Sequence, residues 1–528
     1  MTSVLNSLVS RLSAQALVIR RSPVLFYALG LFVCCIPIIM RLAVICKPPF
    51  TDDGFYALHS MLNYDAITKE GKLLPLGVLQ IYPILSSFIF AFDINHMLAL
   101  RLLDMAIACI MAWLAYRLIT QESDSVYVGF FISSMFVLAM NQELFIQRGF
   151  KNSIFVALVF LFISLRKGLE NKLNSQNTWI VCGVFVGISI CFREAFITFA
   201  IVGFFSILFS YGLRSSLSFV FGSVISIAII ISILAIGRGG FWNIVEAYSM
   251  FSSAAQISGK LASNSMLWFE LTGKEINFLM PAFFLFVLGL VIGFFRKKVT
   301  LLPVTFWLAV SVAPLPEIVA KGGYGYHFAV CLVGLSGLFA YTFRAWKINH
   351  SLLSSFAVFI VFVITFLLAF SRLPHGHTLV TNIAYLISHV PQKDWPAEQV
   401  YSSHYLLTAD TIRRLSKPND TLETSGINFN VFVPSGLLPP LWSNNHLFDL
   451  GMTALAKNWS AYQLAEQIKI NKTNIIFVSD RPGFGAEILK DAMLLLPEYT
   501  MAAYIPVDPS KDYGGFSGGI YMRQKGEP

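Results

Sequence analysis

Long apolar runs recur along the first 372 residues of this 528-residue chain. Most are about 17–22 residues long, and about 20 apolar residues in a helix cross the hydrocarbon core of a bilayer. The sequence is 56% hydrophobic and only 13% charged, whereas soluble domains average about 25% charged residues. The first run is too long and too uninterrupted for a cleaved signal peptide. These features predict a polytopic α-helical membrane protein rather than a soluble one.

The same pattern predicts about eleven transmembrane helices. The apolar run 81–92 is too short to cross a bilayer, so we interpret it, together with 53–74, as helices at the membrane surface. The spans are expected near residues 24–45, 97–116, 125–141, 153–165, 178–192, 195–211, 216–236, 278–295, 300–315, 326–343 and 351–371.

Basic residues set the orientation of these spans. Clusters of Lys and Arg precede the first span and follow the second, fourth, sixth, eighth and tenth, which places them all on one side. Short cytoplasmic loops carry such an excess, so we expect the amino terminus in the cytoplasm. The net charge of +9 is then a topology signal, and no nucleic-acid partner is expected. The residues concerned are Arg20, Arg21, Arg117, Arg166, Lys167, Lys172, Arg214, Arg296, Lys297, Lys298, Arg344 and Lys347.

The last part of the chain is polar and follows the last span. We therefore expect a transmembrane domain over 1–372, with periplasmic loop helices at 46–96, and a C-terminal extracytoplasmic α/β domain over 373–528. The α/β domain has no nucleophile-elbow or phosphate-loop signature. Its predicted helices are 403–415, 460–470 and 485–496, and its predicted strands are 421–424 and 475–479.

An acidic pair follows the first span where the chain leaves the membrane. Charged carboxylates close to a bilayer are energetically unfavourable and usually have a function. Asp52 and Asp53 are therefore the candidate catalytic residues. The sequence of residues 51–54 is also typical of a helix cap or a turn, and this alternative stays open. If a helix begins near Gly54, His59 shares a face with Asn63. We place His59 in the substrate pocket, with an interfacial histidine as the alternative.

Basic residues in two further external loops are candidates for binding a lipid phosphate. Arg148 and Lys151 lie in one loop, with Glu143 upstream in a position to contact a sugar. Arg193 lies between two spans with almost no linker, where an unpaired charge is costly. A solvated loop is the alternative for the first group, and pairing with Glu194 is the alternative for Arg193.

The outer end of the tenth span carries a third group. Lys321 precedes three glycines interleaved with Tyr324 and Tyr326, and His327 follows directly. A cation with aromatic hydroxyls and a histidine suits an anionic, hydroxyl-rich ligand such as a sugar phosphate. The alternative is an aromatic belt with a snorkelling lysine. Arg372, directly after the last span, is a further candidate for the phosphate.

Taken together, the chain resembles the GT-C glycosyltransferases, which include lipid A aminoarabinose transferases, protein O-mannosyltransferases and oligosaccharyltransferases. The likeness covers an odd number of spans, an acidic pair opening the first external loop, surface helices before the second span, and a C-terminal external domain. It also covers Arg101-Leu102 at the start of the second span, the stretch 325–328, and the strand-then-proline layout of residues 424–440.

The resemblance implies a polyprenyl-phosphate-linked sugar donor and makes Asp52 or Asp53 the catalytic acid of the family's first external loop. That carboxylate would act as general base on the acceptor hydroxyl, and a single displacement would invert the anomeric carbon. Many members carry a second acid in the next external loop. Here that loop has only Glu143 upstream, so no metal site is assigned and a divalent cation stays open as a cofactor. His375 and His377 lack a third ligand.

The expected acceptor is O-antigen, lipopolysaccharide or another cell-envelope glycan or lipid, on the working hypothesis of a multi-pass protein in a bacterial inner membrane. A transporter or flippase of lipid-linked sugars is the main alternative. It would need charged residues inside spans or internal repeats, and the polar residues collect instead on one face. A polysaccharide polymerase or ligase and a non-catalytic receptor are further alternatives.

Overall fold

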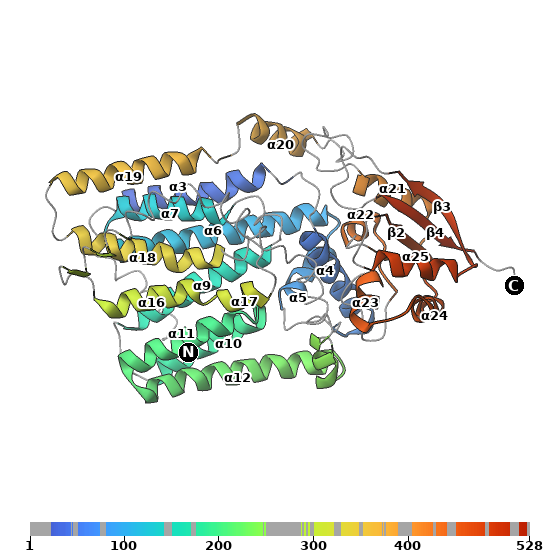
Figure 1. Ribbon diagram of the computed structural model, residues 1–528, viewed down its shortest axis with the longest axis horizontal. Helices are drawn as coiled ribbons and strands as arrows, with labels where there is room; N and C mark the ends of the chain where they lie inside the picture. The colour runs from blue at the N-terminus through green and yellow to red at the C-terminus, as the bar shows by residue number, and fades with distance from the viewer. Residues whose placement is uncertain are drawn as a thin grey trace.

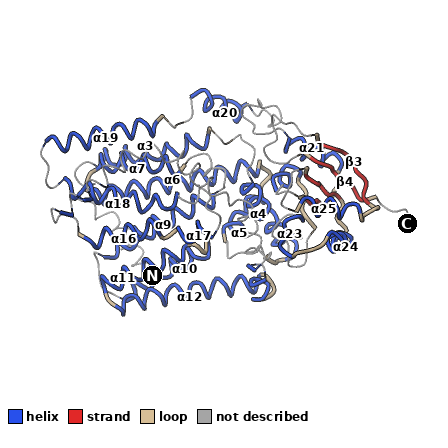
Figure 2. The backbone as a smooth tube through the Cα atoms, in the orientation of Figure 1, coloured by secondary structure: helices blue, strands red, loops and turns tan. Residues whose placement is uncertain are grey.

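The computed structural model describes residues 23–43, 45, 51–73, 81–141, 150–170, 176–246, 248–249, 287, 290–291, 294–295, 300–320, 329–347, 352–371, 373, 376–388, 404–425, 429–440, 450–480, 485–506 and 517–524. A bundle of long helices occupies one end of the molecule, and an α/β part occupies the other (Figure 1). Among the described residues, the strands lie in the α/β part (Figure 2).

The bundle consists of helices that run side by side (Figure 1). In the described part of the chain, four helical segments are long and apolar enough to cross a membrane: Pro23–Leu42, His96–Ser123, Leu213–Gly237 and Leu301–Ile318. Every predicted span coincides with a helix except 278–295, most of which lies outside the described residues. The helices are α3 (Pro23–Leu42), α6 (His96–Ser123), α7 (Val126–Met140), α9 (Phe150–Glu170), α10 (Gln176–Phe192), α11 (Phe196–Tyr211), α12 (Leu213–Gly237), α16 (Leu301–Val312), α18 (Ala329–Lys347) and α19 (Leu352–Phe370).

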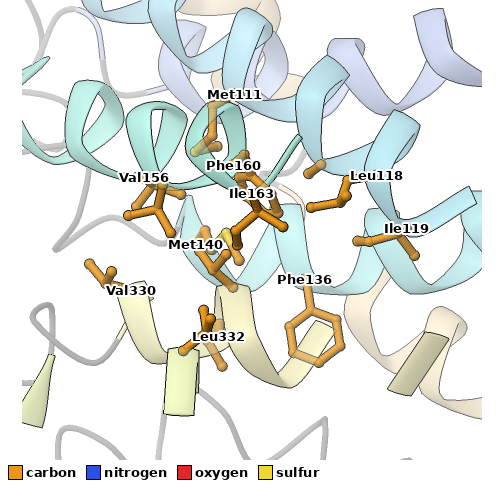
Figure 3. Packing of buried hydrophobic residues seen from close by; sticks show 14 of the residues in the cluster. Met111, Leu118, Ile119, Phe136, Met140, Val156, Phe160, Ile163, Val330 and Leu332 are labelled. Atoms are coloured by element: carbon orange, nitrogen blue, oxygen red, sulfur yellow. The ribbon is translucent and has the colours of Figure 1, made fainter. Parts of the chain in front are cut away.

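Apolar side chains from several helices fill the centre of the bundle. Met111 of α6, Phe136 of α7, Phe160 of α9 and Leu332 of α18 point toward one another in one cluster (Figure 3). In lipid, helices associate through close packing more than through the hydrophobic effect. Helices α10 and α12 approach each other closely, since a Cβ atom on Gly183 would lie 2.0 Å from a backbone oxygen of α12. A small residue at this position thus allows the backbones of α10 and α12 to pack closely.

Three helical elements lie between the bundle and the α/β part. They are α4 (Thr51–Glu70), α5 (Tyr82–Ser86) and the 3-10 helix η1 (Ser87–Ala91), so helices do form in the two stretches predicted as surface helices. Phe55, Leu58 and Phe90 are buried in one cluster with residues of the α/β part. Protein therefore covers much of their apolar surface, which the sequence suggested would face the membrane boundary.

The α/β part is built on a four-stranded sheet with strand order β1-β2-β4-β3. Strand β1 pairs in parallel with β2, and β4 runs antiparallel to both β2 and β3. Strands and helices are present at the predicted positions 421–424, 475–479, 403–415, 460–470 and 485–496, whereas β3 and β4 were not predicted. The elements are α20 (Gly376–Ser388), α21 (His404–Leu415), β1 (Leu422–Thr424), η5 (Phe429–Val431), α22 (Phe432–Ser435), α23 (Leu450–Lys457), α24 (Ala461–Asn471), β2 (Ile475–Ser479), α25 (Ala486–Leu494), β3 (Tyr499–Ile505) and β4 (Gly518–Arg523).

The two faces of the sheet have different partners. Alternate side chains of a strand point to opposite faces. Ile475 and Phe477 of β2 belong to the cluster that contains α4, α21 and α22. Ile476 and Val478 pack instead against α23, α24 and α25. One sheet face thus shares its buried cluster with α4, and α4 lies in the contact between the two parts of the molecule.

Candidate active site at the start of α4

The acidic pair lies in the first turn of α4. The helix begins at Thr51, so Asp52 and Asp53 are its second and third residues. Their backbone is described, but their side chains lie outside the described part. A carboxylate in the first helical turn is favoured by the positive end of the helix dipole. The capping alternative and the catalytic interpretation are therefore compatible with the same backbone position.

A buried polar network lies in the bundle close to α4. Arg41, near the end of α3, donates from Nε to Oδ2 of Asp104 on α6 at 2.7 Å. The same guanidinium donates to Oδ1 of Asn141 after α7, and to Oγ of Ser153 on α9 at 2.8 Å. All four residues are buried. The network ties four helices together at the point where the chain leaves α3 toward the acidic pair.

Two further hydrogen bonds hold the segment after α3. Arg101 of α6 donates from Nη1 to the carbonyl oxygen of Ile45 at 2.5 Å. Asn382 of α20 donates from Nδ2 to the carbonyl oxygen of Ala43 at 2.8 Å. The exit of the chain from the bundle is thereby fixed from two directions. Sequence reasoning missed the network, although an arginine and an aspartate inside adjacent spans predict a pair because neither is stable alone in a membrane.

His59 lies on α4, further along the helix than the acidic pair. Its side chain is buried, and its ring centroid lies 3.9 Å from that of Phe55. The predicted shared face is present, because Asn63 is also buried and donates from Nδ2 to the carbonyl oxygen of His59 at 3.0 Å. His59 therefore lies within the protein interior near the candidate site rather than exposed at a membrane surface.

Arg193 has a partner that the sequence did not indicate. It donates from Nη2 and Nε to Oε1 of Glu317, at 2.7 and 3.1 Å, and its guanidinium lies 4.4 Å from the ring centroid of Phe155. Glu317 belongs to α17 (Leu315–Ala320), which directly precedes Lys321. The side chain of Arg193 is only 3% exposed. This geometry weighs against direct phosphate binding and makes Arg193 a support for α17.

The side chains of the remaining predicted site residues lie outside the described part of the chain. Lys151 has its backbone in α9, while its side chain lies outside the described part. Within the described ranges, no group of three or more His, Cys, Asp or Glu residues is arranged to hold a metal ion. The predicted residues that lie outside the described part are Arg148, Glu143, Lys321, Tyr324, Tyr326, His327 and Arg372.

Arg238 is a buried cation that was not among the site residues predicted from the sequence. It follows α12 directly and is 5% exposed. Its Nε and Nη1 atoms meet no acceptor in the described part of the chain, and burial lowers its pKa to about 10. The neighbouring carbonyl of Gly237 accepts from the backbone N–H of Leu73, just after α4, at 2.8 Å. Arg238 thus lies beside the carboxyl end of α4, whereas the acidic pair lies at the amino end of this 20-residue helix. The label of α12 lies in the helical bundle, and α4 lies between the bundle and the α/β part (Figure 1).

A signal for Arg238 exists in the sequence. An arginine ends a long apolar run, and the nearest acidic residue is Glu246, two turns further along the chain. A buried guanidinium is unfavourable unless it is paired. An arginine at the end of a span with no acidic residue nearby is therefore a candidate for binding an anionic ligand.

No protein-family model matches the sequence, and no curated protein matches it. Solved structures do match. ArnT from Cupriavidus metallidurans bound to undecaprenyl phosphate has a TM-score of 0.60 at 10% sequence identity, over 96% of this chain and 99% of that chain. The chain has the GT-C fold. The resemblance predicted from the sequence is thereby confirmed as a likeness of fold.

Two further structures complete the comparison. ArnT from the same organism in the apo state has a TM-score of 0.56 at 10% identity, over 94% of this chain and 97% of that chain. The archaeal oligosaccharyltransferase AglB from Archaeoglobus fulgidus, in complex with an inhibitory peptide and a dolichol-phosphate, is more distant. Its TM-score is 0.49 at 14% identity, over 97% of this chain and 75% of that chain.

Proposed function

We propose that this GT-C-fold chain is an inverting glycosyltransferase that uses a polyprenyl-phosphate-linked sugar. The observation that carries the proposal is the fold likeness to ArnT, a structure of which holds undecaprenyl phosphate, over nearly the full length of both chains. The acceptor would be O-antigen, lipopolysaccharide or another glycan or lipid of the cell envelope. The enzyme would lie in a bacterial inner membrane, with its α/β part in the periplasm and membrane lipid around the bundle.

The reaction would take place at the start of α4. Asp53 or Asp52 removes the proton of the acceptor hydroxyl as general base, which requires hydrogen-bond reach to that hydroxyl. The acceptor oxygen then attacks the anomeric carbon of the sugar, and the bond to the lipid phosphate breaks. Because one displacement occurs, the configuration at the anomeric carbon inverts. The residues proposed to line the sugar pocket remain His59, Glu143, Tyr324, Tyr326 and His327.

The leaving phosphate needs positive charge where its own negative charge develops. Arg238 is a candidate among the described residues, because it is buried and its Nε and Nη1 atoms have no acceptor in the described part. It lies beside the carboxyl end of α4, so the sugar phosphate would extend along the helix from the acidic pair. A phosphate oxygen can accept from a guanidinium through two parallel hydrogen bonds. Lys321, Arg148, Lys151 and Arg372 remain proposed phosphate ligands, whereas Arg193 moves to a supporting role.

The transporter alternative gains no support from the charges inside the bundle. Arg41 and Asp104 are the cation and the carboxylate of one hydrogen-bonded network. Such a network ties helices together, and its two charges are paired with each other. The enzyme interpretation therefore accounts for more of the observed polar groups. A divalent cation remains an open cofactor.

A transfer assay tests the proposal. Purified protein in detergent would receive synthetic polyprenyl-phosphate sugars and a crude cell-envelope acceptor, and sugar transfer would be followed for wild type, Asp52→Asn and Asp53→Asn. We expect one variant to lose at least about a thousandfold in rate, which corresponds to roughly 4 kcal/mol of barrier. Asp491→Asn, on the exposed face of α25, is the matched control and should transfer normally. Normal transfer by both Asp52→Asn and Asp53→Asn would overturn the assignment.

A further inference from the structure

The first turn of α4 makes an unusually close contact with the α/β part. A Cβ atom built on Gly54 would lie 1.9 Å from Oδ1 of Asn430 and 2.9 Å from its Cα atom. Any residue larger than glycine would therefore overlap the asparagine side chain. Asn430 belongs to η5, which follows β1, and both η5 and α22 contact α4. The contact lies one residue after the acidic pair.

Both partners in this contact are unfavourable choices for stability alone. Gly54 lies within a helix, and glycine destabilises a helix relative to alanine. Its backbone has helical geometry, so no positive φ explains the glycine. Asn430 is 3% exposed, and its Oδ1 atom accepts no hydrogen bond from any residue in the described ranges. A buried oxygen without a donor is destabilising and calls for an explanation.

Hydrophobic packing already joins α4 to the α/β part without this contact. Phe55 and Leu58 of α4 share one buried cluster with Val431 and Phe432, which follow Asn430 directly. These side chains hold the two parts together. The Gly54–Asn430 contact instead fixes the position of the first helical turn against a rigid neighbour, since a glycine backbone and an amide meet without flexible atoms between them.

We propose that Asn430 is a positioning residue for the transfer reaction. It lies directly against Gly54, fixes the first turn of α4, and thereby holds the backbone of Asp52 and Asp53 in place for catalysis. The α/β part would then complete the active site by setting the position of the carboxylates. This inference rests on the function proposed above, and its failure can be told apart from the failure of that function.

The test is a double-mutant cycle in the full-length protein with the transfer assay. Gly54→Ala places a methyl group where the amide oxygen lies, so we expect kcat to fall at least about thirtyfold. Asn430→Ala removes the support without adding atoms, so we expect a fall of about three- to tenfold. In both variants KM for the donor should stay unchanged. Gly376→Ala is the matched control, because a Cβ at that helical glycine meets nothing within 4 Å.

The double variant tests whether Asn430 acts on catalysis through Gly54. In Gly54→Ala/Asn430→Ala the overlap with the amide is gone, but the new Cβ still lies 2.9 Å from the Cα atom of residue 430. We therefore expect kcat to recover in part, so that the double variant loses less than the product of the two single effects. A multiplicative loss, or full activity of Asn430→Ala, would overturn the proposal. So would a loss that appears in donor KM alone. If wild type transfers no sugar from any donor, the proposed function fails first, and the inference falls with it.

Discussion

Replacing Arg238 with methionine should stabilise the fold and weaken donor binding at the same time. Burial lowers the pKa of Arg238 from 12.5 to about 10, which corresponds to about 3 kcal/mol against the charged form at about 1.4 kcal/mol for each tenfold change in acid constant. Methionine keeps an apolar side chain of similar length and removes the charge. Because local relaxation recovers part of the penalty, we expect the free energy of unfolding to rise by about 1–3 kcal/mol.

The assay is thermal unfolding of the detergent-solubilised protein with and without undecaprenyl phosphate. A ligand at a hundred times its Kd stabilises the folded state by about 2.7 kcal/mol. Wild type should show this gain. Arg238→Met should start from a higher midpoint without lipid and gain much less when the lipid is added, because the guanidinium that would bind the phosphate is gone.

Arg193→Met is the matched control, because it removes a buried arginine that is paired. Loss of Arg193 breaks its ion pair with Glu317, and breaking one half of a buried pair costs about 3–5 kcal/mol. The two substitutions should therefore shift the midpoint in opposite directions. If Arg238→Met unfolds as early as Arg193→Met and keeps the full lipid-induced gain, the assignment of Arg238 as a phosphate ligand is wrong.

Three further predictions concern the scaffold. Arg41→Met should lower the free energy of unfolding by about 3–5 kcal/mol, because Asp104 is left buried and unpaired. Arg41→Met/Asp104→Leu should recover most of this loss, measured by thermal unfolding. No recovery in the double variant would contradict the pairing of Arg41 with Asp104. Gly187→Leu should lower the midpoint sharply, since a Cβ there lies 2.0 Å from Oγ of Ser226; an unchanged midpoint would mean that α10 and α12 do not pack closely. Ser460→Ala removes the capping box of α24 and should cost about 1 kcal/mol in denaturant unfolding; a change below a few tenths would refute it.

The helical bundle was readable from the sequence because membrane spans are encoded locally. Length and apolarity mark each helix without knowledge of its neighbours. The positions of strands β1 and β2 were also readable, since residues 475–479, for example, form a short apolar run that is buried along its whole length. Their parallel pairing was not predicted. Strand β3 was missed because its middle residues are largely exposed and include two alanines, and β4 begins with two glycines. Neither carries the alternation of a half-buried strand.

The candidate site was readable only in part, since its key contacts join distant parts of the chain. The start of α4 at the acidic pair followed from local capping chemistry. The pairing of Arg193 with Glu317 did not, because the partners are far apart in the sequence and Glu194 was a nearer choice. The contact between Gly54 and Asn430 is likewise tertiary. The sequence shows which loops carry charged residues. Only the packed structure shows which of these charges are paired with a residue from a distant part of the chain.

The stereochemistry of a single turnover tests the central claim most directly. A synthetic polyprenyl-phosphate sugar of defined anomeric configuration would be offered to the purified enzyme with an envelope glycan acceptor, and the new linkage would be determined by NMR. Attack by an acceptor oxygen activated by Asp52 or Asp53 predicts a product of the opposite anomeric configuration. A product of retained configuration would contradict the single displacement, and absence of transfer to every acceptor would contradict the glycosyltransferase assignment itself.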